Sequence, residues 1–283
     1  MTALKASITP DIDYLGVEYA YLDYYEKSGL MDQIRSHIDT VGARPTQKQW
    51  DAAWQEIYDA ELNDPMWLQS NANRLSLIAG TIFRWNQEYI TAVDPKLEKK
   101  YHEGVVKNII QHYFSNVDYV VEFGCGTGHN LRTVQAQRPD IRVYGSDFTA
   151  SSLKCLDRLD IPGFKFDLRD SDDRSVPMEL KHNHSRVGIL TVGALEQVGS
   201  YFSNFIKFCR SFQPSECVHV EPIVELYDDS NPVDRLAIDY HHARGYLSGF
   251  FPALKEDGLL KSYERSTFGN SFNEGYTVLR WNT

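Results

Sequence analysis

Three glycines that alternate with other residues follow an acid and a short apolar run, and this pattern could bind a nucleotide-like ligand. The run Val120–Gly128 reads Val-Val-Glu-Phe-Gly-Cys-Gly-Thr-Gly, and we expect a helix from His129. Because glycine lacks a Cβ, it lets the backbone turn sharply and lets a ligand approach closely. A plain strand-to-helix turn rarely needs three glycines at this spacing. The run therefore favours a cofactor loop.

Two acids downstream stand where they could contact the same ligand. Asp147 ends the next strand-like run, about 20 residues past the loop, where a carboxylate can hold a ribose diol. The alternative is that Asp147 caps a helix beginning near Thr149. Asp167 ends the third strand-like run, although it also belongs to an acidic stretch with Asp170, Asp172 and Asp173 that fits a solvated loop.

The glycine run and the segments after it resemble the class I S-adenosylmethionine-dependent methyltransferases. Glu122, two residues before the first glycine of a G-x-G-x-G loop, is typical of motif I in that family. The resemblance covers residues 98 to 283 and implies S-adenosyl-L-methionine as cofactor, with Asp167 facing the adenine amino group. The residues that it implies for cofactor binding are Glu122, Gly124, Gly126, Gly128, Asp147, Phe148, Asp167 and Leu168.

A fourth strand-like run also fits the family. Arg186–Val192 is followed by Gly193–Val198, which is similar to the family's segment beside the transferred methyl group. Thr191 stands where many members carry an acid. This departure argues against the metal-dependent catechol-type subgroup, whose ion needs a carboxylate near that strand end.

The order of strands and helices predicts an α/β fold with a doubly wound, mostly parallel seven-stranded sheet. An antiparallel pair near 259–263 and 276–281 is expected to close the sheet, as in the family. Ligands bind such sheets at the C-terminal strand ends, beside the switch in strand order. The other expected strands cover 118–123, 141–146, 164–168, 186–192 and 217–221, and the expected helices cover 96–114, 129–138, 149–158 and 201–212.

The first 95 residues differ in pattern and are predicted to form a helical cap or lid on a methyltransferase domain at 96–283. Thr46 and Gln49 form a capping box before a helix that carries Trp50 and Trp54 on one face. A further helix is predicted over residues 71–85.

Aromatic residues upstream predict a helical stripe of Tyr14, Val17, Tyr21 and Tyr24, with Tyr25 beside it. The stripe either packs against the main domain or another subunit, or its tyrosines line the acceptor pocket. A homodimer is thus one reading of this segment.

Composition limits the partners. The formal net charge of −10, without a long Lys/Arg cluster, disfavours nucleic acid. Four cysteines without a C-x-x-C pair are typical of reduced thiols. No stretch is apolar enough for a signal peptide or a membrane span, so a cytoplasmic protein without membrane contact is predicted.

Several residues could take a proton from a methyl acceptor. Asp239 lies one helical turn before His242 and could fix its tautomer; the alternative is a helix-surface or structural histidine with an incidental acid neighbour. Glu196 follows the strand nearest the expected methyl group, and Glu221 and His241 are further candidates. His219, Glu221 and His241 lack the spacing of a metal site, so no metal is predicted.

These features together predict an enzyme that methylates an oxygen or nitrogen of a small molecule, such as a sugar or specialised metabolite. Two alternatives stay open at this point. One is methylation of a protein or peptide side chain, and the other is a catalytically inactive cofactor-binding scaffold.

Overall fold

A seven-stranded sheet forms the centre of the protein in the computed structural model, which describes residues 7–63, 82–94, 96–170, 175–181 and 186–283. Its order is β6-β5-β4-β7-β8-β11-β9. The first five of these are parallel to one another, and β11 runs antiparallel to both β8 and β9. The predicted fold class is therefore confirmed. The strands are β4 (Tyr119–Phe123), β5 (Arg142–Asp147), β6 (Gly163–Lys165), β7 (Val187–Val192), β8 (Glu216–Glu221), β9 (Leu260–Glu264) and β11 (Thr277–Trp281).

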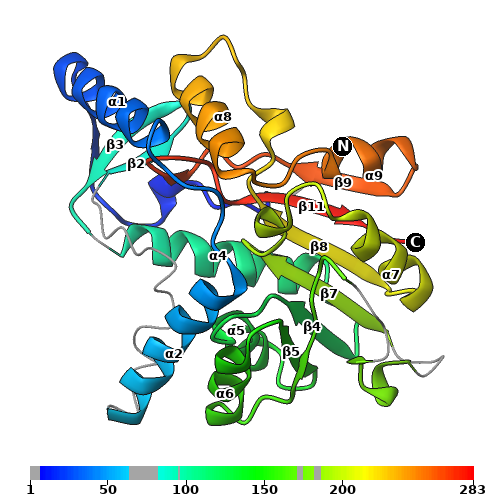
Figure 1. The fold of residues 1–283 in the computed structure, drawn as a ribbon. Helices are drawn as coiled ribbons and strands as arrows, with labels where there is room; N and C mark the ends of the chain where they lie inside the picture. Colours follow the sequence, from blue (N-terminus) through cyan, green and yellow to red (C-terminus); the bar gives the residue numbers. More distant parts are fainter. Residues whose placement is uncertain (1–6, 64–81, 95, 171–174, 182–185) are drawn as a thin grey trace.

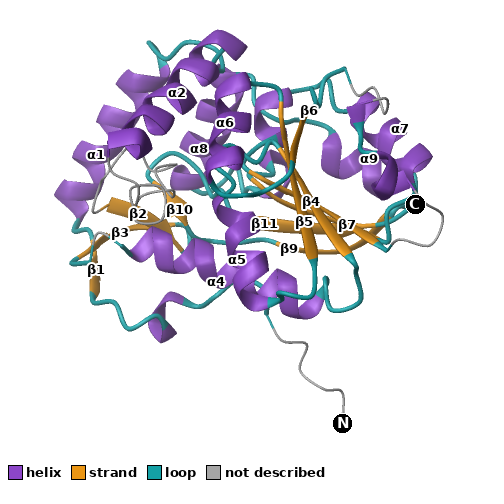
Figure 2. Ribbon diagram, turned by 90° about the horizontal axis from the view of Figure 1, so that it is seen from below, coloured by secondary structure: helices purple, strands orange, loops and turns teal. Residues whose placement is uncertain are grey.

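Helices cover both faces of this sheet (Figure 2). One face packs against α4 (Leu97–His112), α5 (His129–Gln137) and α6 (Ala150–Arg158). The other face packs against α7 (Ser203–Phe212) and α9 (Phe250–Glu256). Neighbouring strand residues such as Val120 and Val121 belong to opposite cores because successive side chains of a strand point to opposite faces.

The strand order changes direction at β4, which lies between β5 and β7. The chain runs from β4 towards β6 on one side and returns through β7 on the other. The loops that follow β4 and β7 separate at this point, which opens a crevice at the C-terminal edge of the sheet. The glycine run occupies the first of these loops.

The N-terminal part was predicted to be helical, but it also contributes strands to a small antiparallel sheet. Its order is β1-β3-β2-β10. The helix expected over 71–85 is wrong at its end, because 82–85 form a strand, and residues 71–81 lie outside the described residues. The strands are β1 (Tyr19–Tyr21), β2 (Ile82–Trp85), β3 (Glu88–Ala92) and β10 (Gly269–Asn270).

A two-residue turn explains the hairpin between β2 and β3. Asn86 and Gln87 both have positive φ, at 50° and 62°. This backbone matches the twist of the flanking strands. Three consecutive buried residues in β2, Phe83 to Trp85, hide the alternation that would have marked a strand.

The tyrosine stripe predicted on one helix is also wrong. Tyr14 ends a short 3-10 helix, η1 (Ile12–Tyr14), Tyr21 lies in β1, and Tyr24 begins α1 (Tyr24–Ile38). All three side chains are exposed, as is Tyr25. The helix α1 instead buries other residues against α8 (Pro232–Arg244), which lies beside it in Figure 1.

The second N-terminal helix, α2 (Gln47–Asn63), packs on α6 (Figure 1). Its predicted capping box is confirmed, since Thr46 N donates to Gln49 Oε1 (2.8 Å) and Gln49 N donates to Thr46 Oγ1 (3.4 Å). Packing on α6 brings α2 to the same sheet edge as the glycine run. It is thus α2, within the predicted N-terminal cap, that reaches the crevice.

A buried group of charges ties the small sheet to the main one. Arg84 from β2 donates to Asp234 of α8, and its side chain is fully buried with those of Asp234 and Glu274. Arg265 completes the group, with contacts of 2.7 Å to Asp234 and 2.9 Å to Glu274. Two guanidinium groups therefore neutralise two buried carboxylates, as burial of charge requires.

The cysteines are free and buried, so no disulfide contributes to the fold. Within the described ranges, no helix combines the length and the apolar character that crossing a membrane would need.

Candidate functional site

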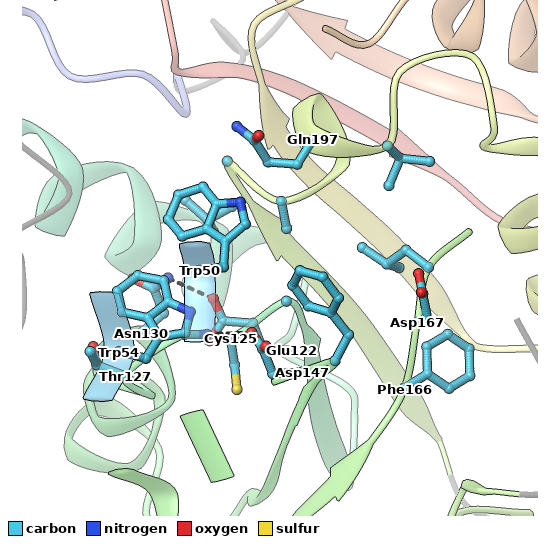
Figure 3. Close-up of a pocket in the computed structure, with 18 of the residues that line it drawn as sticks. Trp50, Trp54, Glu122, Cys125, Thr127, Asn130, Asp147, Phe166, Asp167 and Gln197 are labelled. Carbon is cyan, nitrogen blue, oxygen red and sulfur yellow. Dashed lines mark hydrogen bonds between the residues drawn. The ribbon is translucent and has the colours of Figure 1, made fainter. Parts of the chain in front are cut away.

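A pocket of about 970 Å³, counting the solvent at its mouth, lies at the C-terminal edge of the sheet. It is bounded by the loops after β4, β5, β6 and β7 and by α2 (Figure 3). Seven of the eight residues predicted to bind the cofactor line it, and Gly128 does not. Those seven are Glu122, Gly124, Gly126, Asp147, Phe148, Asp167 and Leu168.

The three glycines serve different purposes. All have positive φ. A Cβ on Gly124 would lie 2.4 Å from the Cβ of Ala194, and one on Gly128 would lie 2.7 Å from Leu156 Cδ2, so these two permit internal packing. A Cβ on Gly126 would lie 3.0 Å from Trp54 Cζ2, and Trp54 belongs to α2 and lines the pocket. The absence of a Cβ on Gly126 therefore lets the indole from α2 approach the loop closely.

Asp147 links the glycine loop to the next helix. Its Oδ2 accepts from the backbone N–H of Gly126 (3.2 Å), and its Oδ1 accepts from the N–H (2.9 Å) and hydroxyl (2.8 Å) of Thr149. Thr149 is the N-cap of α6. Asp147 thus does bond to the residue at the start of α6, as the alternative interpretation expected. Its binding of a ribose stays a prediction. Burial raises the pKa of this carboxyl.

Glu122 is buried below the loop with one oxygen unpaired. Its Oε1 accepts from Asn130 Nδ2 (2.7 Å), whose Oδ1 contacts His102 Nε2 at 2.6 Å. Because the amide oxygen can only accept, His102 donates through Nε2. Glu122 Oε2 has no hydrogen-bond partner. Burial raises the pKa of Glu122 to about 8, against the opposing effect of Asn130, and the charge of Asp147 adds to the rise.

Two histidines beside Glu122 also line the pocket. Burial lowers the pKa of His129 to about 4 and lowers that of His102. His129 Nε2 is buried without a hydrogen-bond partner. Both rings are therefore neutral near pH 7. These residues and Asn130 were not predicted as site residues, although His129 and Asn130 directly follow the glycine run.

Asp167 reaches the pocket but is held by a neighbour. Arg169 donates to it through Nε (2.9 Å) and Nη2 (2.7 Å), and the half-buried carboxylate has a lowered pKa, with its bonds to Arg169 outweighing burial. The guanidinium of Arg169 lies 5.4 Å from the ring centre of Phe148. A contact between Asp167 and adenine stays a prediction.

A chain of buried hydrogen bonds runs across three strands behind the pocket. Trp281 Nε1 donates to His219 Nε2 (2.7 Å), so the ring proton sits on Nδ1, which contacts Thr191 Oγ1 at 2.8 Å. The Thr191 hydroxyl then donates to Glu221 Oε1 (2.8 Å). Burial lowers the pKa of His219 to about 3. Thr191, found where the family often has an acid, thus connects a neutral histidine to a carboxylate.

Glu221 uses both oxygens to hold the loop after β7. Its Oε1 accepts from the backbone N–H groups of Ala194 (3.1 Å) and Leu195 (3.0 Å), and its Oε2 accepts from that of Glu196 (3.0 Å). Burial raises its pKa to about 7. This geometry favours a structural anchor over a base for the acceptor.

Glu196 lies in η4 (Leu195–Val198) next to the pocket but does not line it. Its Oε1 accepts from Gln197 Nε2 (2.8 Å), and Gln197 does line the pocket. Burial, together with the nearby charge of Glu221, raises the pKa of Glu196 to about 8. Glu196 therefore contacts the pocket through Gln197, whose buried Oε1 has no hydrogen-bond partner.

The structure does not bring His242 and Asp239 to the pocket. His242 is exposed on α8, and Asp239 pairs with Arg235 at 3.2 Å. Neither lines the pocket. His241, on the buried side of α8, contacts the carbonyl of Leu247 at 2.5 Å. The catalytic roles predicted for His242 and Asp239 are thus without support from this geometry, because the buried face of α8 points to α1 rather than to the crevice.

No protein-family model matches the chain, and no curated protein matches it. Solved structures resemble it weakly. The methyltransferase domain of bacterial CtHen1 is 15% identical over 64% of this chain and 97% of that one, with a TM-score of 0.46. Human N-acetylserotonin methyltransferase in complex with SAM is 9% identical over 64% and 56%, with a TM-score of 0.42. The CurJ carbon methyltransferase is 13% identical over 90% and 70%, with a TM-score of 0.46.

Proposed function

We propose that this protein is an S-adenosylmethionine-dependent methyltransferase that acts on an oxygen or nitrogen of a small molecule. One observation carries the proposal. A buried carboxyl with an unpaired oxygen, Glu122, lies beside a glycine loop that ends the central strand of a doubly wound sheet, where such folds bind ligands. Unpaired buried polar atoms are rare, and one that lines a pocket is explained by a ligand that supplies its partner.

The pocket residues suit the parts of S-adenosylmethionine. Glu122 Oε2 would accept from the ammonium group of its amino-acid end, and His129, whose Nε2 is also unpaired, lines the same pocket. Asp147 would hold the ribose hydroxyls, and Phe148 would flank the adenine. Both acids line one pocket, which suits a cofactor with two positive charges. When bound, the cofactor supplies an electrophilic methyl group.

The residues on the acceptor side favour a small, partly aromatic or apolar molecule. Trp50, which stacks on Trp54 with ring centres 5.4 Å apart, forms one wall of the pocket. Gln197, on the loop after β7, also lines the pocket (Figure 3). A hydroxyl or amine of the acceptor could donate to the unpaired Oε1 of Gln197. Alignment of the acceptor is then the main contribution of the chain to the transfer.

Methyl-labelled S-adenosylmethionine tests this proposal. The protein is incubated with two panels, one of small alcohols, phenols and amines and one of peptides and folded proteins. We expect label on a small molecule, and loss of transfer in Glu122→Ala. Label on the protein panel alone would favour side-chain methylation. Binding of the cofactor without transfer to either panel would favour the scaffold.

A further inference from the structure

We propose that Trp54 is a displaceable plug that occupies the cofactor's contact with the glycine loop. This inference rests on the proposed function. The indole of Trp54 lies where the cofactor must approach Gly126. Binding therefore requires the ring to swing away while α2 stays attached to α6.

The position of the ring carries the first step. The Cζ2 and Cη2 atoms of Trp54 lie 3.0 and 3.2 Å from the place of a Cβ on Gly126. The other two loop glycines face Ala194 and Leu156 within the fold. Of these three glycines, Gly126 is the one whose Cβ position faces the Trp54 indole. The indole and a ligand compete for that approach.

Hydrogen bonds attach α2 to α6 and to the loop before it, independently of the Trp54 ring. Asp51 Oδ1 accepts from Ser151 N (3.0 Å), and the Ser151 hydroxyl donates to the carbonyl of Asp51 (2.6 Å). Gln47 Nε2 donates to the carbonyl of Phe148 (2.8 Å), and Lys154 donates to Gln55 (2.8 Å). These bonds lie on the side of α2 that faces α6. They hold the backbone of α2 without using the Trp54 ring.

The weak packing of the ring carries the third step. No side chain described in α2 is buried, and Trp54 is only partly covered. The ring lies against Gly126 and stacks on the indole of Trp50 at an interplanar angle of 22° (Figure 3). Because the ring is only partly covered, it can leave Gly126 more easily than a core side chain could.

Calorimetry with S-adenosylhomocysteine tests the plug on the full chain. Removal of a competing group raises apparent affinity by the fraction of molecules that it blocked. We expect Trp54→Ala to tighten binding about 3- to 10-fold. Tyr58→Ala is the matched control, because Tyr58 lies one turn later on α2, contacts Lys154 and lies outside the pocket. We expect its affinity to stay within about twofold of wild type.

Tryptophan fluorescence gives a second readout. We expect a red shift of wild-type emission on addition of S-adenosylhomocysteine, lost in Trp54→Phe. Circular dichroism checks that each variant folds.

Weaker binding by Trp54→Ala would overturn the plug and make the indole a wall on which the cofactor packs. Equal tightening by Tyr58→Ala would also overturn it, since looser docking of α2 would then be the cause. A fluorescence change that Trp54→Phe retains would do the same. If neither wild type nor Trp54→Ala binds, the proposed function itself fails. Binding by Trp54→Ala alone would support the plug.

Discussion

The carboxyl of Glu122 should make cofactor binding strongly dependent on pH. Burial raises its pKa to about 8, so near pH 7 most molecules hold it protonated before the cofactor arrives. An ammonium group needs the ionised form. Below pH 8, binding must therefore release this proton, and affinity should increase as the pH rises towards 8.

The size of the effect follows from the pKa. Each pH unit below 8 lowers the ionised fraction about tenfold, or about 1.4 kcal/mol of binding free energy. Between pH 7.5 and 6 the dissociation constant should thus rise about 20- to 30-fold. Other groups near Glu122 do not account for such a change, since burial lowers the pKa values of His102 and His129 and raises that of Cys125. Asp147, Glu196 and Glu221 also have raised pKa values and are the acids to control for.

Calorimetry of S-adenosylmethionine in buffers of different ionisation enthalpy measures the proton directly. Wild type should release close to one proton at pH 6.5, and Glu122→Gln should release none from this position while binding more weakly at pH 8. The ligand's own titration is common to both proteins. Equal pH dependence in wild type and Glu122→Gln would refute the assignment of this carboxyl to the cofactor's ammonium group.

Three further substitutions test the rest of the account. Thr191→Val should lower the free energy of unfolding by about 1–3 kcal/mol in urea titrations, because His219 and Glu221 each lose a buried partner. Arg84→Met should cost about 3–5 kcal/mol by the same measurement, since it leaves buried carboxylates undercompensated; a loss under 1 kcal/mol would contradict this. His242→Ala should keep near-normal kcat, because the side chain is exposed away from the pocket, and a large fall in kcat would restore its predicted role as base.

The main sheet could be predicted because its strands are short apolar runs separated by segments with helical periodicity, and β4, β5, β7 and β8 end at or directly before a glycine or an acid. The small sheet could not be predicted from the sequence. Its strand β2 buries three consecutive residues instead of alternating, and its fourth strand, β10, comes from Gly269–Asn270, far away in the sequence. Pairing over such a distance leaves no local pattern.

The site residues, too, could be predicted from the sequence only in part. Glu122 and Asp147, which both line the pocket, could be predicted because the resemblance marks the acid before the glycine loop and because Asp147 stands about 20 residues past that loop. His102 could not, because α4 meets Asn130 only after the helices pack on the sheet. The pairing of Asp239 with His242 relied on helical spacing alone, which says which residues share a face but not what that face meets.

Calorimetric titration with S-adenosylmethionine tests the central claim most directly. We expect saturable binding at one site, competed by S-adenosylhomocysteine and weakened about tenfold or more in Asp147→Ala, because charged hydrogen bonds of this kind contribute about 1.5–3 kcal/mol. Binding should also be lost in Gly126→Val, whose side chain would enter the approach to the loop. Absence of binding by wild type, or unchanged affinity in both variants, would contradict the account.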